Sequence, residues 1–146
     1  VKVNTYGWDT HGDNFNGQRS LVGRFDQAFA AIVEDLADSG QLDNVLVIAM
    51  SEFGRTPRIN GHIGRDHWPE AWSLVMGGRG VERGAVVGQT DEQGVFVTSD
   101  EYDIGHMFHT WFAALGIDSK LTEYDNAGQP LPIAHDDFHA VKELLT

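Results

Sequence analysis

The sequence predicts an α/β fold, a three-layer sandwich with a mostly parallel sheet, and three observations lead to that prediction. Residues 1–6 have the composition of a β-strand, residues 21–36 have the periodicity of an amphipathic helix, and residues 45–50 are continuously apolar. A strand, a helix and a strand in this order are typical of a parallel crossover unit. Because residues 45–50 show no alternation, we expect them to form a parallel strand that is buried on both faces.

The first helix is predicted by a single apolar stripe whose members recur at steps of three and four residues. The stripe consists of Leu21, Val22, Phe25, Ala28, Phe29, Ile32, Val33 and Leu36. Gly40 follows the stripe at the position where a glycine often ends a helix in the left-handed conformation. We therefore expect the helix to end there and the chain to turn at residues 43–44.

The remainder of the chain contains a long loop, another strand and a second helix. Residues 57–70 are rich in Gly, His and Arg and lack periodicity, and connections of this length are often functional. Residues 71–76 are predicted to be a strand, and residues 79–100 turns and short strands. Apolar residues between positions 104 and 115 predict a second amphipathic helix. We expect the tail to be loop, with a last helical turn at residues 141–145.

The composition limits the classes of function. The chain has 146 residues, the length of one domain, and 41% hydrophobic residues can supply a core. Ten basic and 22 acidic residues give a net charge of -12, which argues against a nucleic-acid partner. The acidic surplus serves either solubility or a carboxylate-rich cation site. No apolar run reaches the length of a membrane span, and the absence of cysteine excludes disulfides, thiolate metal sites and thiol catalysis.

Three polar clusters follow predicted strands, at residues 9–13, 51–56 and 64–68. Functional loops of a parallel sheet lie at the carboxyl ends of its strands, so we expect the clusters to converge. Together they supply three Asp, one Glu, two His and two Arg. These are ligand types for Zn, Mn, Mg or Ca, with arginines that can hold an anion.

Each cluster also has an ordinary structural explanation when it is taken alone. Asp9 and His11 could form a turn or a helix cap, and Glu52 could pair with Arg55. The conjunction of three clusters is what favours a metal site over three unrelated turns. The other histidines are expected to be solvated or structural. They are His62, His106, His109, His135 and His139.

Three segments resemble the signature blocks of a bacterial, sulfatase-like family, domain-of-unknown-function family 1501. They are Gly7-Trp8-Asp9-Thr10-His11-Gly12, Glu52-Phe53-Gly54-Arg55-Thr56-Pro57 and Gly64-Arg65-Asp66-His67-Trp68-Pro69. Residues 88–94 and 114–118 are similar to later segments of that family.

The resemblance covers nearly the whole chain and implies an alkaline-phosphatase-like fold that is incomplete at the N-terminus. The chain starts without Met and without a targeting signal. We therefore expect residues 1–146 to be the C-terminal portion of a single alkaline-phosphatase/sulfatase-like domain whose N-terminal half is missing.

The resemblance to the alkaline phosphatase superfamily also implies roles for individual residues. The predicted metal ligands are Asp9, His11, Glu52, Asp66 and His67, and the predicted anion-holding catalytic residues are Arg55 and Arg65. Asp13 is an alternative ligand in the first cluster. Phe53 stands where a second metal would need a histidine, and none of the nearby hydroxyls matches the position of the superfamily nucleophile. Zinc is the expected divalent metal, with calcium or manganese as alternatives.

The function implied by the resemblance is metal-dependent hydrolysis of sulfate or phosphate esters, as part of a longer enzyme whose nucleophile lies outside this fragment. The alternative is a non-catalytic, metal-supported binding module for sulfated or phosphorylated glycans, which Phe53 favours. A third interpretation is that the polar clusters are only turns and caps. The expected partners are a small anionic ester or sulfated glycan and the missing N-terminal half, with neither nucleic acid nor membrane. By resemblance, the protein is expected to be exported or periplasmic.

Overall fold

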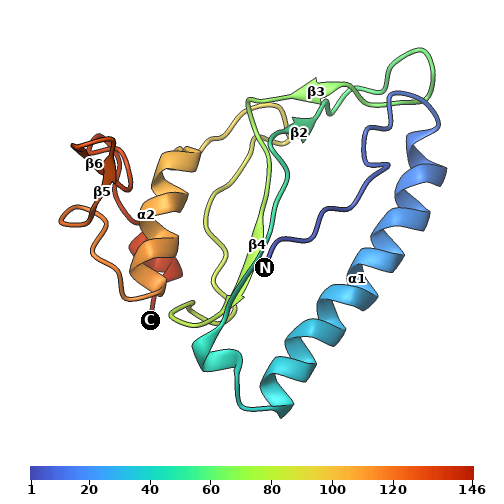
Figure 1. Cartoon of the computed structure of the whole chain (residues 1–146). Coiled ribbons are helices and arrows are strands. Elements are labelled where there is room, and N and C mark those ends of the chain that lie inside the picture. The colour runs from blue at the N-terminus through green and yellow to red at the C-terminus, as the bar shows by residue number, and fades with distance from the viewer.

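A computed structural model describes all 146 residues of the chain. Its elements, in chain order, are α1 (Asn14–Asp38), the 3-10 helix η1 (Leu42–Asn44), β1 (Leu46–Ala49), β2 (Gly54–Arg55), β3 (His67–Trp68), β4 (Val75–Gly78), α2 (Ile104–Ala114), β5 (Glu123–Asn126), β6 (Gln129–Pro132) and the 3-10 helix η2 (Lys142–Leu144). Helix α1 and the β1–β4 pair form two separate arms that meet near η1 and near the loops around β2 and β3, with the N-terminal segment between them (Figure 1). None of the helices combines the length and apolarity that a membrane span needs.

The prediction of a three-layer sandwich with a mostly parallel, alkaline-phosphatase-like sheet is wrong. The strands form three two-stranded sheets, β1–β4, β2–β3 and β5–β6, and each pair is antiparallel. Residues 1–6 form no strand, so there is no strand, helix, strand crossover. The chain instead leaves β1, reverses through the β2–β3 hairpin and returns as β4, which sets Leu46 opposite Gly78 and Ala49 opposite Val75. That reversal makes the pairing antiparallel.

The predicted strand at residues 45–50 is present over residues 46–49, but it is neither parallel nor buried on both faces. Strand β1 is half-buried along its length, and the next residue, Met50, is exposed. Only 10 of the 146 residues are buried, and the accessible surface of the chain is 10284 Å². A compact monomer of this mass would expose about 7,400 Å². The apolar strand is therefore not enclosed within a layered core.

Helix α1 confirms the predicted helix and its predicted end. The N–H of Gly40 donates to the Ala37 carbonyl, and the N–H of Gln41 donates to the Leu36 carbonyl at 2.7 Å. These two bonds form a Schellman motif, and it needs a residue in the left-handed conformation. Gly40 supplies that conformation with φ 69°.

The small core of the chain lies around α2 and the C-terminal segment. Asp103 caps α2 by accepting from the N–H of Gly105. The His109 ring is almost fully buried: its Nε2 donates to the His135 carbonyl, and its Nδ1 lies 2.6 Å from the Ser119 hydroxyl. Both ring nitrogens are thus satisfied, so His109 has the structural role that was predicted for it.

Candidate metal centre

Two irregular loops position the candidate site, and the β2–β3 hairpin supports one of them. The hairpin sets Arg55 opposite His67. Residues 9–13 run along the loop between β2 and β3, and the N–H of Arg65 donates to the Thr10 carbonyl at 3.1 Å. The two backbones approach so closely at buried Gly64 that an added Cβ would collide with the His11 carbonyl. Glycine at position 64 therefore permits the contact that brings the loops together.

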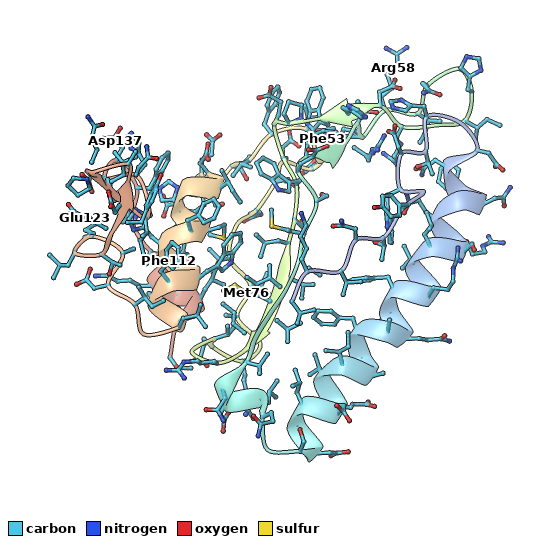
Figure 2. All side chains as sticks on the ribbon, viewed as in Figure 1. Phe53, Arg58, Met76, Phe112, Glu123 and Asp137 are labelled. Carbon is cyan, nitrogen blue, oxygen red and sulfur yellow. The ribbon has the colours of Figure 1, made fainter.

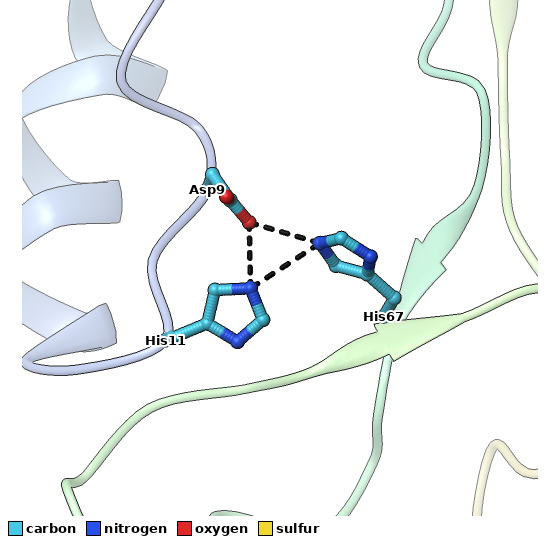
Figure 3. A group of neighbouring side chains, drawn as sticks. All are labelled: Asp9, His11 and His67. Carbon is cyan, nitrogen blue, oxygen red and sulfur yellow. Dashed lines mark hydrogen bonds and ion pairs between the residues drawn. The ribbon is translucent and has the colours of Figure 1, made fainter.

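Three ligand atoms from these loops converge on one point (Figure 3). Asp9 Oδ1 lies 2.8 Å from His11 Nε2 and 3.0 Å from His67 Nε2, and the two Nε2 atoms are 3.2 Å apart. Atoms that each lie 2.0–2.2 Å from a tetrahedral zinc ion would be about 3.3–3.6 Å apart. The three side chains are about half exposed or more. The group could therefore hold a metal ion, with one side open to solvent.

The hydrogen bonds of His11 provide a second reason why a cation fits this group. His11 Nδ1 lies 2.7 Å from Asp66 Oδ1, and a carboxylate only accepts, so Nδ1 carries the proton. A neutral His11 ring then directs the lone pair of Nε2 at Asp9 Oδ1, an unfavourable contact. The contact is favourable if the ring gains a second proton or if a cation lies between the two atoms. A divalent metal satisfies the second condition.

Asp9 is held in its charged form by its neighbours. Hydrogen bonds from Arg55 and His67, with the nearby His11 ring, lower the pKa of Asp9 from 3.8 to about 2. Arg55 Nη2 donates to Asp9 Oδ1 at 2.7 Å, and its Nη1 donates to the Arg65 carbonyl at 3.2 Å. A metal ligand must be deprotonated, and Asp9 meets that requirement at any physiological pH.

The other predicted metal ligands lie outside the converging group. Asp66 reaches the group only through the Nδ1 side of His11, which together with Asn60 lowers the pKa of Asp66. Asp13 accepts from the Asn16 side chain at the start of α1. Glu52 is exposed and lines a groove beside β4. The structure brings together three of the five predicted ligands, in a group that could hold a metal ion, but the sequence could not tell which carboxylates point to the same place.

The two predicted anion-holding arginines differ in their hydrogen-bond partners. Arg65 Nη1 donates to the carbonyls of Thr56 and Pro57, at 2.6 and 2.7 Å, and thereby ties the long loop to the chain after β2. Arg55 lies directly beside Asp9. Of the two, Arg55 is the one whose charge adjoins the group of ligand atoms.

Phe53 packs against His67, the candidate ligand on the hairpin. Its ring centroid is 4.1 Å from that of His67, with 34° between the planes, and the Arg55 guanidinium lies 6.0 Å from the Phe53 centroid. Figure 2 shows Phe53 beside β2 and β3, far from Phe112 on α2. A phenyl ring cannot bind a metal, so Phe53 contributes a packing contact to His67 rather than a ligand.

Sequence reasoning missed one residue of this region, Asn60. Its side chain donates to Asp66 Oδ1 and to the His11 carbonyl, and accepts from the N–H groups of His62 and Gly64. The only signal at this position is the Asn60-Gly61 pair, which is typical of a turn. That signal predicts the local bend, but not the link to the first loop.

The chain belongs to the family described as "Protein of unknown function (DUF1501)", which matches residues 1–145. This confirms the resemblance at the level of the family. The sulfatase-like character and the place in the alkaline phosphatase superfamily stay predictions. No curated protein and no solved structure matches the chain.

Proposed function

We propose that this member of the DUF1501 family binds a divalent metal ion through Asp9, His11 and His67, and that the centre serves hydrolysis of sulfate or phosphate esters. The observation that carries the proposal is the convergence of one carboxylate oxygen and two imidazole nitrogens within 3.2 Å of one another. Two nitrogen ligands favour zinc. Calcium prefers an all-oxygen shell, and manganese favours oxygen-rich ones.

The open side of the group is what favours catalysis over a purely structural site. Catalytic zinc sites have three protein ligands and keep the fourth position for water or substrate, whereas structural sites have four protein ligands. When bound, the metal would supply a Lewis acid that polarises an ester oxygen and activates water. The chain itself keeps Asp9 charged, and places the positive charge of Arg55 where an anionic ester would approach.

The hydroxyl groups nearest the site already have hydrogen-bond partners, and the Thr56 hydroxyl, for example, donates to the Arg58 carbonyl at 2.8 Å. The Thr10 hydroxyl lies between the side chains of Asn14 and Gln18, at 2.6 and 3.1 Å. The Ser51 hydroxyl donates to the Phe53 carbonyl at 2.8 Å. We therefore propose that these residues supply metal and anion binding, and that the nucleophile is water or a residue of a longer parent protein. Membership of the alkaline phosphatase superfamily, also a proposal, favours the second source.

The second candidate function is binding of a sulfated or phosphorylated glycan without turnover. The observation that favours it is the packing of Phe53 on His67, which leaves the centre with a single set of ligands. A one-metal centre with an adjoining arginine can hold an anionic group even where no nucleophile is present. The two candidates share the metal site and differ only in turnover.

Calorimetric titration of the chain with zinc, manganese and calcium tests the metal site. We expect one zinc ion per chain, weaker binding of the other two ions, and loss of zinc binding in the His67→Ala variant. His62→Ala is the matched control, because His62 is an exposed histidine of the same loop that lies outside the converging group. Equal zinc affinity in both variants would refute the site.

Hydrolysis of an aryl sulfate and an aryl phosphate, with and without zinc, then tests the reaction. We expect turnover to depend on zinc. We also expect it to be much slower with residues 1–146 than with a longer parent protein. Tight zinc and sulfate binding without turnover in either protein would favour the glycan-binding function. Equal turnover by both proteins would show that no residue outside this chain is needed.

A further inference from the structure

Asp66 was predicted to be a metal ligand, but its contacts suggest a different role. Its Oδ1 atom lies 2.7 Å from His11 Nδ1, on the side of the ring opposite the converging Nε2. The same oxygen accepts from Asn60 Nδ2 at 3.1 Å. Asp66 therefore reaches the group of ligand atoms through the His11 ring, and its own position is set by Asn60.

Asn60 uses both ends of its side chain to join the two loops. Its Nδ2 donates to the His11 carbonyl at 3.0 Å as well as to Asp66. Its Oδ1 accepts from the N–H groups of His62 and Gly64, each at 2.9 Å. Asn60 thus contacts both the backbone of His11 and the Asp66 carboxylate, which accepts a hydrogen bond from the His11 ring.

We propose that Asp66 and Asn60 are positioning residues that present His11 Nε2 to the metal. This inference rests on the proposed metal-binding function. Asp66 keeps the proton of a neutral His11 on Nδ1, so that Nε2 holds a lone pair, and Asn60 holds Asp66 and the His11 backbone in register. Ligating histidines commonly donate their second N–H to a carboxylate or carbonyl, and loss of such a partner lowers metal affinity by about 10- to 100-fold.

The tautomer of His11 in the metal-free protein tests the role of Asp66 without any metal. Imidazole nitrogen-15 NMR at pH 8 should show Nδ1–H for His11 in the wild type. In Asp66→Ala, that tautomer should give way to a mixture, while the His109 signals stay unchanged because His109 has its own partners. Asp66→Asn retains an oxygen acceptor and should restore most of the Nδ1–H form. An unchanged His11 tautomer in Asp66→Ala would overturn the inference.

Zinc affinity gives the second readout. We expect a loss of about 10- to 100-fold in Asp66→Ala, a smaller loss in Asp66→Asn, and an intermediate loss in Asn60→Ala. Equal, complete loss in Asp66→Ala and Asp66→Asn would instead identify Asp66 as a direct ligand and overturn the positioning role. Asp26→Ala, on the exposed face of α1, is the control for loss of one carboxylate.

The two readouts separate failure of this inference from failure of the proposed function. Absence of zinc binding by the wild type would remove the proposed function and the metal-positioning role with it. Normal wild-type affinity that Asp66→Ala leaves unchanged would remove only the inference. Proton–nitrogen NMR spectra of each variant show whether the fold persists, and the Asp66→Asn comparison keeps the test valid if Asp66→Ala unfolds.

Discussion

The loops of the candidate metal centre and the arm formed by α1 are built on different physical principles. The loops hold each other by hydrogen bonds: Asp13 and Asn14 donate from their backbones to residues 62 and 63, and Arg65 donates back to Thr10. Helix α1 carries a long apolar stripe, yet Val22 and Ile32 are each 48% exposed. The backbone groups that join the two loops are thus hydrogen-bonded within the chain, while much of the apolar stripe of the helix is exposed to solvent.

Few side chains from the rest of the chain cover the apolar stripe of α1. Trp8 meets Phe25 edge-on at 6.2 Å, and Phe25 lies 5.6 Å from Phe29. The β1–β4 pair opposite is an isolated two-stranded sheet, a unit that is marginally stable in water. A wide groove of about 1530 Å³ runs beside β4 and the segment after it. The difference teaches that a polar site can be locally specified even where the surrounding scaffold has little core.

The comparison predicts that the strongest damage to the site comes from separating its two loops. In Gly64→Ala the new Cβ would collide with the His11 backbone, so the loops must move apart and His11 must leave the other two ligands. We expect zinc affinity to fall by about 100-fold or more, because loss of a residue that supports a metal ligand already lowers affinity by up to about 100-fold. Calorimetric titration with zinc measures the change.

Gly61→Ala is the matched control for this prediction. Gly61 lies in the same loop, a Cβ added there would meet no atom within 4 Å, and its φ is not positive. We expect its zinc affinity to stay within a factor of two of the wild type. Similar losses in Gly61→Ala and Gly64→Ala would mean that general loop rigidity, rather than the close approach at Gly64, maintains the site.

A smaller effect is expected from Arg55, whose hydrogen bond is the largest cause of the low pKa of Asp9. In Arg55→Met, the pKa of Asp9 should rise from about 2 toward its ordinary value of 3.8. Because the folded-state pKa is lowered, the charged Asp9 contributes stability above pH 3.8, and this contribution is lost as the pH falls through about 2. In the variant, the loss should occur at higher pH.

Carbon-13 NMR titration of the Asp9 carboxyl group measures this shift. Arg58→Met is the control, because Arg58 is an exposed arginine in the loop just after β2 and does not contribute to the pKa of Asp9. An unchanged Asp9 titration in Arg55→Met would contradict the ion pair. A matching shift in Arg58→Met would show that the net charge of the loop, rather than the Arg55 contact, sets the pKa.

The same comparison shows which parts of the fold the sequence could predict. Helix α1 and its end at Gly40 follow from local periodicity and from one glycine with a left-handed backbone. The direction of β1 does not, because a continuously apolar run is compatible with parallel and antiparallel pairing alike. Pairing of Gly54 with Trp68 turns the chain back on itself. That register depends on contacts across the irregular loop of residues 56–66 and leaves no periodic signal.

The candidate site was predictable in its residue types and not in its geometry. Asp9, His11 and His67 were recognisable as ligand types in polar clusters. Asp66 lies on the opposite side of the His11 ring because of the way two irregular loops pack. Loop sequences have no periodic pattern from which the direction of a side chain could be predicted. The neighbouring positions 66 and 67 therefore have separate roles that sequence spacing alone could not distinguish.

The smallest effect on the site is expected from changes in α1, and two glycines of that helix provide opposite changes in stability. Gly23 lies within the helix with open space around it, so Gly23→Ala should stabilise the chain by about 0.5–1 kcal/mol. Gly40 has φ 69°, where an alanine costs roughly 1–2 kcal/mol, so Gly40→Ala should destabilise it. If the site is specified within its own loops, zinc affinity should change by less than a factor of two in both variants. Denaturant unfolding followed by circular dichroism measures the stabilities, and calorimetry measures the affinities at a temperature where every variant is folded. Zinc affinity that rises in Gly23→Ala and falls in Gly40→Ala would show that the loops depend on the order of α1, and the contrast between the two regions would then be wrong.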